Sequence, residues 1–159
     1  TARYAIQRKL IYHRRMIIMN KTAYDMCYYD SMIPKNRYLF KLIVRNTDEP
    51  FRVIEDYMKS DYRKAMDRGN PLYLNKTPKQ ILGSIGIRIK PEAGINEKYD
   101  EFILEWMADV YTYMQWKYDL KSEDIVDKIK PEELYNKYFP LHEASLENGA
   151  EKLKKIYNI

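Results

Sequence analysis

Cysteine, glycine and histidine are scarce in this sequence, and each shortage excludes a class of protein. The single cysteine, Cys27, excludes an internal disulfide framework and a cysteine-rich zinc site, so a reducing compartment, the cytoplasm, is the expected location. Five glycines in 159 residues are few for a turn-rich β fold. The two histidines, His13 and His142, lie far apart, and neither has a metal-ligating partner at helical spacing. The sequence therefore predicts no bound metal.

Long apolar runs and a phosphate-binding loop are missing as well. The apolar run 42–44 is far shorter than the roughly 18 to 20 residues of a membrane span, and the basic start lacks the apolar segment of a signal peptide. The glycines at 83 and 86 lack the lysine and the preceding strand of a phosphate loop. We therefore expect no membrane partner, no cofactor and no enzymatic activity.

Tyrosine and charge are what the sequence has in abundance. Sixteen tyrosines and eight methionines favour helices with amphipathic aromatic surfaces. The formal charge is +8 over residues 1–45, +2 over 46–95 and −5 over 96–159. The length fits a single domain, 1–159, with a basic part, 1–90, and an acidic part, 96–159. The basic and acidic parts can attract each other within the fold, or they can form different solvent-exposed faces. Alternatively, the basic part can bind an anionic partner.

The stretch 97–118 has the clearest helical pattern in the sequence. It contains no glycine or proline, Asn96 can cap it, and acids in its first turn and Lys117 in its last complement the helix dipole. We expect one face to lie in the core, with Phe102, Ile103, Trp106, Val110, Tyr113 and Met114. The predicted fold class is mainly α, a helical bundle built around this long helix.

Capping residues, prolines and apolar spacing predict further helices on both sides. A capping box at Thr77 and Gln80 starts one of them, and Pro131 followed by two acids starts another. The predicted segments are 2–19, 23–32, 48–68, 77–83, 122–129, 131–138 and 142–157. In the second of these, which Pro34 should end, large apolar neighbours surround Cys27, so we expect its thiol to be buried and unreactive.

Two segments also allow a small β element. Residues 38–45 mix aromatic and β-branched residues and allow a strand, although we favour the alternative, a buried helix. Residues 84–90 alternate isoleucine with small or charged residues, which predicts a short half-buried strand. If both segments are extended, they can pair as a two-stranded sheet.

The helix predicted at 2–19 carries a basic and aromatic stripe. Guanidinium groups bind phosphates and aromatic rings stack on bases, so this interleaving is typical of a nucleic-acid surface. An ordinary amphipathic helix with arginine stems lying over tyrosine rings is the alternative. The candidate nucleic-acid or anion contacts are Arg3, Tyr4, Arg8, Lys9, Tyr12, Arg14 and Arg15.

An acidic stripe follows the central helix in steps of four residues. It consists of Glu97, Glu101, Glu105 and Asp109. The stripe lies off the expected core face and has no nearby histidine, whereas metal sites in bundles face inward and usually add histidine. We therefore expect a solvated face or a docking surface for basic groups of another protein.

In the C-terminal third, the segment Tyr138-Phe139-Pro140-Leu141-His142 follows the central helix and two shorter predicted helices and precedes the last one. This third resembles small helical proteins of unknown function associated with bacterial toxin–antitoxin cassettes and mobile elements, in which a long amphipathic helix precedes a similar turn. The resemblance implies a non-enzymatic binding protein, antitoxin-like or an inhibitor, that acts through protein–protein contacts. The alternative function is nucleic-acid binding by the basic N-terminal helix.

Overall fold

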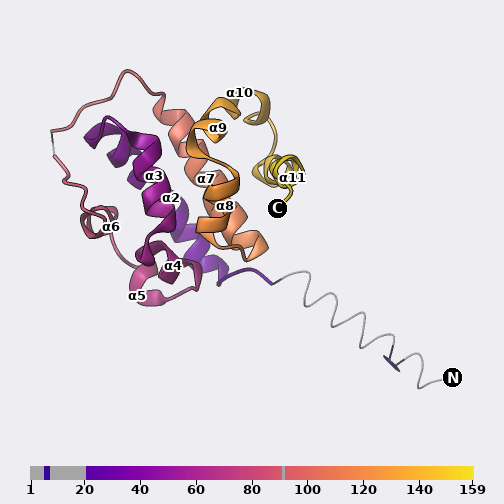
Figure 1. The fold of residues 1–159 in the computed structure, drawn as a ribbon. Coiled ribbons are helices and arrows are strands. Elements are labelled where there is room, and N and C mark those ends of the chain that lie inside the picture. The colour runs from indigo at the N-terminus through magenta and orange to yellow at the C-terminus, as the bar shows by residue number, and fades with distance from the viewer. Residues whose placement is uncertain (1–5, 8–20, 91) are drawn as a thin grey trace.

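The computed structural model describes residues 6–7, 21–90 and 92–159, and the helices of the last two ranges form a helical bundle (Figure 1). Its helices are α2 (Met26–Asn46), α3 (Pro50–Lys59), α4 (Asp61–Asp67), α5 (Pro71–Leu74), α6 (Pro78–Ser84), α7 (Glu101–Tyr118), α8 (Ser122–Lys128), α9 (Pro131–Asn136), α10 (Tyr138–Leu141) and α11 (Leu146–Tyr157). These ranges contain no strand. The mainly α fold class is therefore confirmed. No helix within them is long and apolar enough to cross a membrane.

Helices α2 and α7 form the most extensive contact between any two helices. They run antiparallel, because Arg45, near the end of α2, pairs with Glu101 at the start of α7, while the earlier Arg37 pairs with the later Asp109. Helix α3 packs on α2 and also contacts α8 and α9, while α11 covers another side of α7 (Figure 1). Buried residues from both halves of the sequence, such as Ile43 and Met107, belong to one hydrophobic core.

The strand alternative for residues 38–45 is wrong, because this segment is the second half of α2. Pro34 does not end the helix but lies inside it. A proline in a helix interior costs about 3 kcal/mol, and burial of the following residues against α7 offsets this cost. Helical spacing places Leu39, Phe40 and Ile43 in the core, whereas the alternation of a strand would have divided them between two faces.

The strand predicted at 84–90 is wrong for a related reason. Ser84 is the last residue of α6, and the chain after it is irregular. The isoleucines at 85, 87 and 89 are half-buried and alternate with exposed residues, so the pattern correctly predicted their burial. A strand needs a neighbour for its backbone hydrogen bonds, and the expected neighbour, 38–45, is helical.

The central helix is confirmed, but its start and its buried face differ from the prediction. Asp100, not Asn96, caps it by accepting a hydrogen bond from the amide of Phe102 (2.8 Å). The side chain of Phe102 is 75% exposed, and Trp106 and Tyr113 are only half-buried. The buried apolar residues that the pattern missed are Leu104, Met107, Ala108, Tyr111 and Trp116. Helices pack on several sides of α7, so its buried residues do not form a single stripe.

The expectation that Cys27 is buried is also wrong, because its side chain is exposed. Cys27 is the second residue of α2, and its amide donates a hydrogen bond of 2.8 Å to the capping carboxylate of Asp25. That carboxylate also raises the pKa of the Cys27 thiol, and a raised pKa reduces the fraction of reactive thiolate. Among the apolar neighbours seen in the sequence, Met26 is also exposed, and Tyr28 and Tyr29 are only half-buried.

Several helix ends follow the sequence closely. The capping box of Thr77 and Gln80 is present at the start of α6. Gly69 follows α4 with a φ of +71°, and a side chain there would approach the Cβ of Tyr24 to 3.0 Å. The helix predicted at 48–68 is broken at Ser60, whose extended backbone ends α3 and whose hydroxyl caps α4.

Two phenylalanines of similar chemistry provide a test of this core. Phe40 is 1% exposed and Phe102 is 75% exposed. We predict that Phe40→Ala lowers the free energy of unfolding by about 3–5 kcal/mol, because it leaves a cavity. Phe102→Ala should change it by no more than about 0.5 kcal/mol. Urea denaturation of both variants checks this prediction. Equal losses in the free energy of unfolding would show that Phe102 is buried in the core.

Candidate functional site

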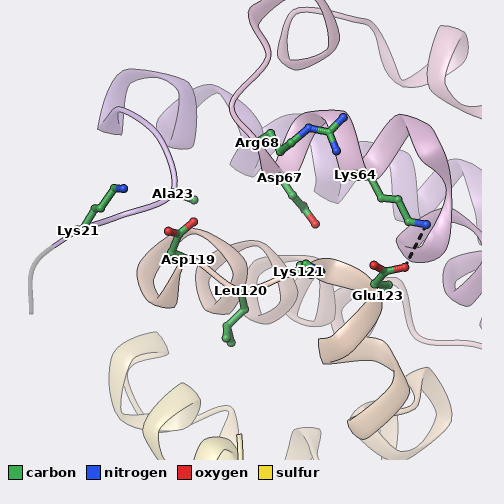
Figure 2. A pocket seen from close by; sticks show the side chains of 9 residues that line it. All are labelled: Lys21, Ala23, Lys64, Asp67, Arg68, Asp119, Leu120, Lys121 and Glu123. Atoms are coloured by element: carbon green, nitrogen blue, oxygen red, sulfur yellow. Dashed lines mark ion pairs between the residues drawn. The ribbon is translucent and has the colours of Figure 1, made fainter. Parts of the chain in front are cut away.

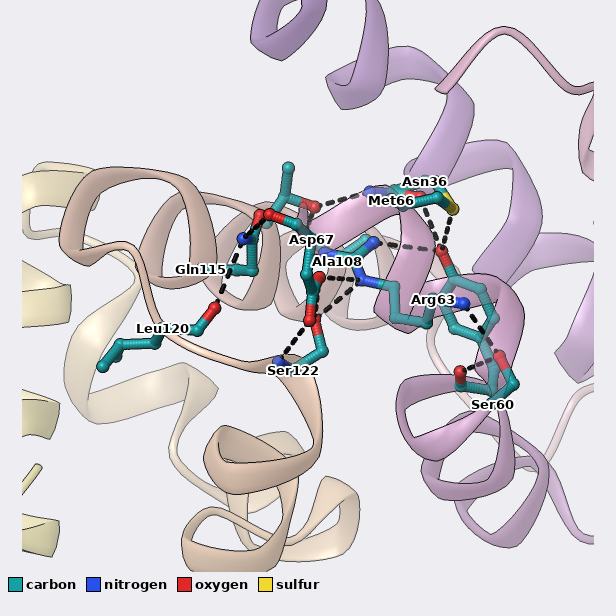
Figure 3. A network of polar contacts seen from close by, with 11 residues as sticks. Asn36, Ser60, Arg63, Met66, Asp67, Ala108, Gln115, Leu120 and Ser122 are labelled. Atoms are coloured by element: carbon teal, nitrogen blue, oxygen red, sulfur yellow. Dashed lines mark hydrogen bonds and ion pairs between the residues drawn. The ribbon is translucent and has the colours of Figure 1, made fainter. Parts of the chain in front are cut away.

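A fully buried arginine lies at the centre of a polar network inside the bundle (Figure 3). The side chain of Arg63, on α4, donates from Nε to Asp67 Oδ1 (3.1 Å) and to Ser122 Oγ (2.7 Å). Its Nη1 donates to the hydroxyl of Tyr57 (3.0 Å). Ser122 in turn donates from its amide and its hydroxyl to the Asp67 carboxylate, at 2.6 and 2.7 Å. The buried positive charge is thus paired with a buried carboxylate.

The network continues from α4 into the central pair of helices. The hydroxyl of Tyr57 donates to Asn36 Oδ1 (3.3 Å), and Asn36 Nδ2 donates to Thr112 Oγ1 (2.7 Å). Gln115 Nε2 donates to the backbone carbonyl of Asp67 (3.3 Å). Five helices, α2, α3, α4, α7 and α8, therefore share one set of hydrogen bonds.

The electrostatics of the network indicate a structural role for its carboxylate. Burial raises the pKa of Asp67, while Arg63 and the hydrogen bonds from Ser122 act in the opposite direction. Both oxygens of this carboxylate accept hydrogen bonds within the network, which is not the arrangement of a base waiting for a substrate proton.

A pocket of about 470 Å³ opens beside this network, and we call it the Asp67 pocket (Figure 2). It lies between the segment before α2, the end of α4 and the turn between α7 and α8, and Asp67 points into it from α4. Asp119, in that turn, has a positive φ of 50°. The lining residues are Lys21, Ala23, Lys64, Asp67, Arg68, Asp119, Leu120, Lys121 and Glu123.

The Asp67 pocket has more basic than acidic groups available for a ligand. Lys64 is paired with Glu123 across the pocket at 3.1 Å, and Asp67 is paired with Arg63. The charged side chains that remain are the exposed Lys21, Arg68 and Lys121 and the exposed Asp119. The pocket can therefore attract an anionic group, but its cations lie on the surface.

Three members of the predicted acidic stripe are held within the protein by basic residues of α2. We call these three ion pairs the α2–α7 ladder: Arg37 with Asp109 at 2.6 Å, Lys41 with Glu105 at 2.8 Å, and Arg45 with Glu101 at 2.5 Å. The basic groups recur every four residues, as the acidic groups do, so two antiparallel helices bring all six into register. The sequence contained this second spacing, but the possibility of a strand at 38–45 concealed it.

The ladder lowers the pKa of Glu101, and it does not include Glu97. The hydrogen bond from Arg45 lowers the pKa of Glu101. Glu97 lies in the turn before α7 and is exposed. Of the predicted acidic docking surface, Glu101, Glu105 and Asp109 thus contact α2, and Glu97 is separate.

Exposed aromatic rings gather near the start of α7. Phe102 is 75% exposed and Phe139 is 74% exposed. Trp106, one turn after Phe102, meets the ring of Tyr138 edge-on at 5.5 Å, and Tyr138 meets Phe139 at 5.4 Å. His142 stacks on Tyr138 at 4.4 Å. We call Phe102, Trp106, Tyr138 and Phe139 the α7–α10 aromatic surface. Sequence reasoning missed it because Phe102 and Trp106 were assigned to the core.

A shallow pocket of about 630 Å³ adjoins this surface, and we call it the α7 N-terminal pocket. Tyr99 and Tyr135 form an aromatic wall with Phe51, whose ring lies 5.4 Å from each. The amide of Asp100 donates to the hydroxyl of Tyr135 (2.9 Å) and fixes this wall to the start of α7. Of the charged residues that line this pocket, three are acidic and one is basic. The lining residues are Ile95, Glu97, Lys98, Tyr99, Asp100, Glu101, Phe102 and Tyr135.

The predicted nucleic-acid contacts lie outside the described residues. They are Arg3, Tyr4, Arg8, Lys9, Tyr12, Arg14 and Arg15. Lys21 is the first residue of the long described range, and it lines the Asp67 pocket. Among residues 6–7, 21–90 and 92–159, no three histidine, cysteine or acidic side chains are grouped so that they could hold a metal ion.

Comparison of the chain with protein families, with curated proteins and with solved structures found no match. The resemblance of the C-terminal third to proteins of toxin–antitoxin cassettes therefore stays a prediction. The two pockets, the α2–α7 ladder and the α7–α10 aromatic surface are the features on which a functional proposal can rest.

The buried pair of Arg63 and Asp67 generates a prediction about stability. Arg63→Met keeps most of the side-chain volume but leaves the Asp67 carboxylate buried without its cation, so we predict a loss of about 3–5 kcal/mol in the free energy of unfolding. Adding Asp67→Asn removes the unpaired charge and should recover part of this loss. Urea denaturation measures both, and a loss below about 1 kcal/mol, typical of exposed pairs, would contradict the central role of Arg63.

The α2–α7 ladder generates a prediction about pH. The pKa of Glu101 in the folded state is lower than its usual value, so its stabilising contribution is complete above about pH 4.5 and is lost as the pH falls through the folded-state pKa. We predict that Glu101→Gln lowers the free energy of unfolding at pH 7 by about 0.2–1 kcal/mol and that this difference disappears in acid. Glu97→Gln, outside the ladder, is the control; a difference for Glu101→Gln that persists at low pH would contradict the assignment.

Proposed function

We propose that this protein is a non-enzymatic binding protein that holds another protein on its α7–α10 aromatic surface, as an antitoxin-like or inhibitor protein of a bacterial mobile element would. The observation that carries the proposal is the exposure of Phe102 and Phe139, 75% and 74%, beside the half-buried Trp106 and Tyr138. The mobile-element origin is supported only by the sequence resemblance of the C-terminal third.

Exposed aromatic rings in one place favour protein binding on energetic grounds. Burying a phenylalanine ring contributes roughly 1.5–3 kcal/mol, and aromatic residues are enriched among the few interface residues that supply most of the binding free energy. Trp106 and Tyr138 pack against each other, so their orientation is set before a partner arrives. A preorganised surface of this kind loses little side-chain entropy on binding.

The charges near the aromatic rings indicate which partner would fit. The α7 N-terminal pocket has Glu97, Asp100 and Glu101 on its rim against a single basic residue, Lys98. Glu101 is already paired with Arg45, so Glu97 and Asp100 are the carboxylates left for a partner. Charge complementarity across an interface favours association and rejects partners of the same sign. A partner with an apolar anchor flanked by basic residues is therefore favoured.

The polar network gives less support to an enzymatic function. Asp67, the buried carboxylate of the Asp67 pocket, is hydrogen-bonded to Arg63 and Ser122. The exposed Cys27 thiol has Asp25, an acid that raises its pKa, as its neighbour. A nucleophilic cysteine needs the opposite, an electropositive setting.

Nucleic-acid binding is the second candidate function, and the Asp67 pocket favours it. Lys21, Arg68 and Lys121 are exposed there, next to the point where the chain continues into residues 1–20. That segment contains five arginines and lysines and no acidic residue. Phosphate groups are the ligands that such clusters attract.

Affinity capture with the full chain, in cells of the natural host, tests the first proposal. We predict that the wild type retains a specific partner protein and that the double variant Phe102→Ala, Phe139→Ala binds this partner about 30-fold more weakly or worse, the loss expected from removing a central anchor of 2 kcal/mol. The dissociation constant is then measured with the purified partner by titration calorimetry.

Leu72→Ala is the matched control, because Leu72 is an apolar residue of α5 that is 71% exposed and lies outside the aromatic surface. It should leave the affinity unchanged. A partner that is lost after nuclease treatment, or that is retained by the double variant, would reject this function, and the first result would favour nucleic-acid binding.

A further inference from the structure

We infer that the α7–α10 aromatic surface and the α7 N-terminal pocket also receive residues 1–20 of a second copy of this chain. The inference rests on the proposed function only because both proposals use the same surface. It adds a homotypic contact that the proposed partner protein would have to displace.

The sequence of residues 1–20 has the chemistry that this surface calls for. The segment carries five basic residues, Arg3, Arg8, Lys9, Arg14 and Arg15, and no acidic residue. Ile6, Leu10 and Ile17 recur at near-helical spacing, which predicts an apolar face opposite the charges. An apolar face with basic flanks matches an aromatic surface with an acidic rim.

Described residues on both sides of the proposed contact are exposed. Ile6 is a described residue of the segment, and its side chain is 59% exposed. Phe102 and Phe139 are exposed at the same time. Exposed groups on both sides of the proposed contact are thus available to a second copy of the chain.

The position of the segment's attachment also favours a second copy. The chain joins the bundle where the amide of Ala23 donates to the carbonyl of Trp116 (2.9 Å), near the end of α7. Phe102 lies 14 residues earlier in the same helix, about 21 Å away at 1.5 Å per residue. If the segment is helical, as its sequence predicts, Arg14 and Arg15 lie nine and eight residues before Ala23, about 12–14 Å along the helix, and fall short of the acidic rim of their own chain. A second copy has no such restriction.

The α7 N-terminal pocket offers room and polarity for such a segment. Its volume of about 630 Å³ exceeds that of a single aliphatic side chain, and the rings of Tyr99, Phe102 and Tyr135 line it. Glu97 and Asp100 lie on its rim, where arginine side chains of the segment would pair with them. Each copy offers one segment and one surface, so two reciprocal contacts close a symmetric dimer.

Sedimentation velocity of the purified full chain tests this inference without any partner protein. We expect a monomer–dimer equilibrium that depends on protein concentration, and a dimer that weakens as salt is raised from 50 to 500 mM because its charge pairs are screened. Phe102→Ala and Glu97→Lys, tested separately, should each raise the dimer dissociation constant by at least about tenfold.

Two controls and one mixing experiment make the test specific. Leu72→Ala should leave the dimer unchanged, and Lys98→Glu, which adds acid to the same rim, should leave it unchanged or strengthen it. The triple change Arg8→Glu, Arg14→Glu, Arg15→Glu should abolish self-association. Mixing this triple variant with Glu97→Lys should restore a dimer, because the intact segment of one copy meets the intact surface of the other.

Three results would overturn the inference. They are a monomer at all concentrations, a dimer that survives both Phe102→Ala and Glu97→Lys, and no recovery on mixing, which would place the segment on its own chain. None of these results bears on the capture of a partner protein by the same surface. Failure of that capture, in turn, leaves the sedimentation result of the purified chain unaffected.

Discussion

The buried charge of Arg63 imposes the strongest constraint on this bundle. A guanidinium group taken out of water is very costly unless it is paired and hydrogen-bonded, and here its network of partners comes from four other elements as well as its own helix. Asp67, Ser122 and Tyr57 must all be in place for the charge to be tolerated. The network therefore specifies the positions of α3, α4 and α8 more narrowly than apolar packing would require. This holds for their positions relative to one another and relative to α2 and α7.

The central pair has its own register, set by the α2–α7 ladder. A slip of α2 along α7 would separate the charges that recur every four residues on both helices. The same ladder occupies three carboxylates that the sequence offered for docking. What remains for a partner is the α7–α10 aromatic surface, with Glu97 and Asp100 beside it.

Both proposals follow from two features, the exposed aromatic surface and the positive charge of residues 1–20. The aromatic surface leaves two phenylalanine rings exposed to water, and residues 1–20 bring positive charge without any acid. A homotypic dimer that covers the surface until a tighter partner arrives would keep the protein from aggregating through these rings. The free energy of dimerisation would then be subtracted from the partner's affinity, as for any ligand that competes for a site.

Local chemistry was enough to predict where many helices begin and end. The capping box of Thr77 and Gln80, the prolines at 50 and 131, and Gly69 act on backbone groups within a few residues, so the sequence shows them directly. Which face of a helix is buried depends on elements far away in the chain. For this reason the exposure of Phe102, the helix at 38–45 and the partners of the acidic stripe became clear only once α2 was placed against α7.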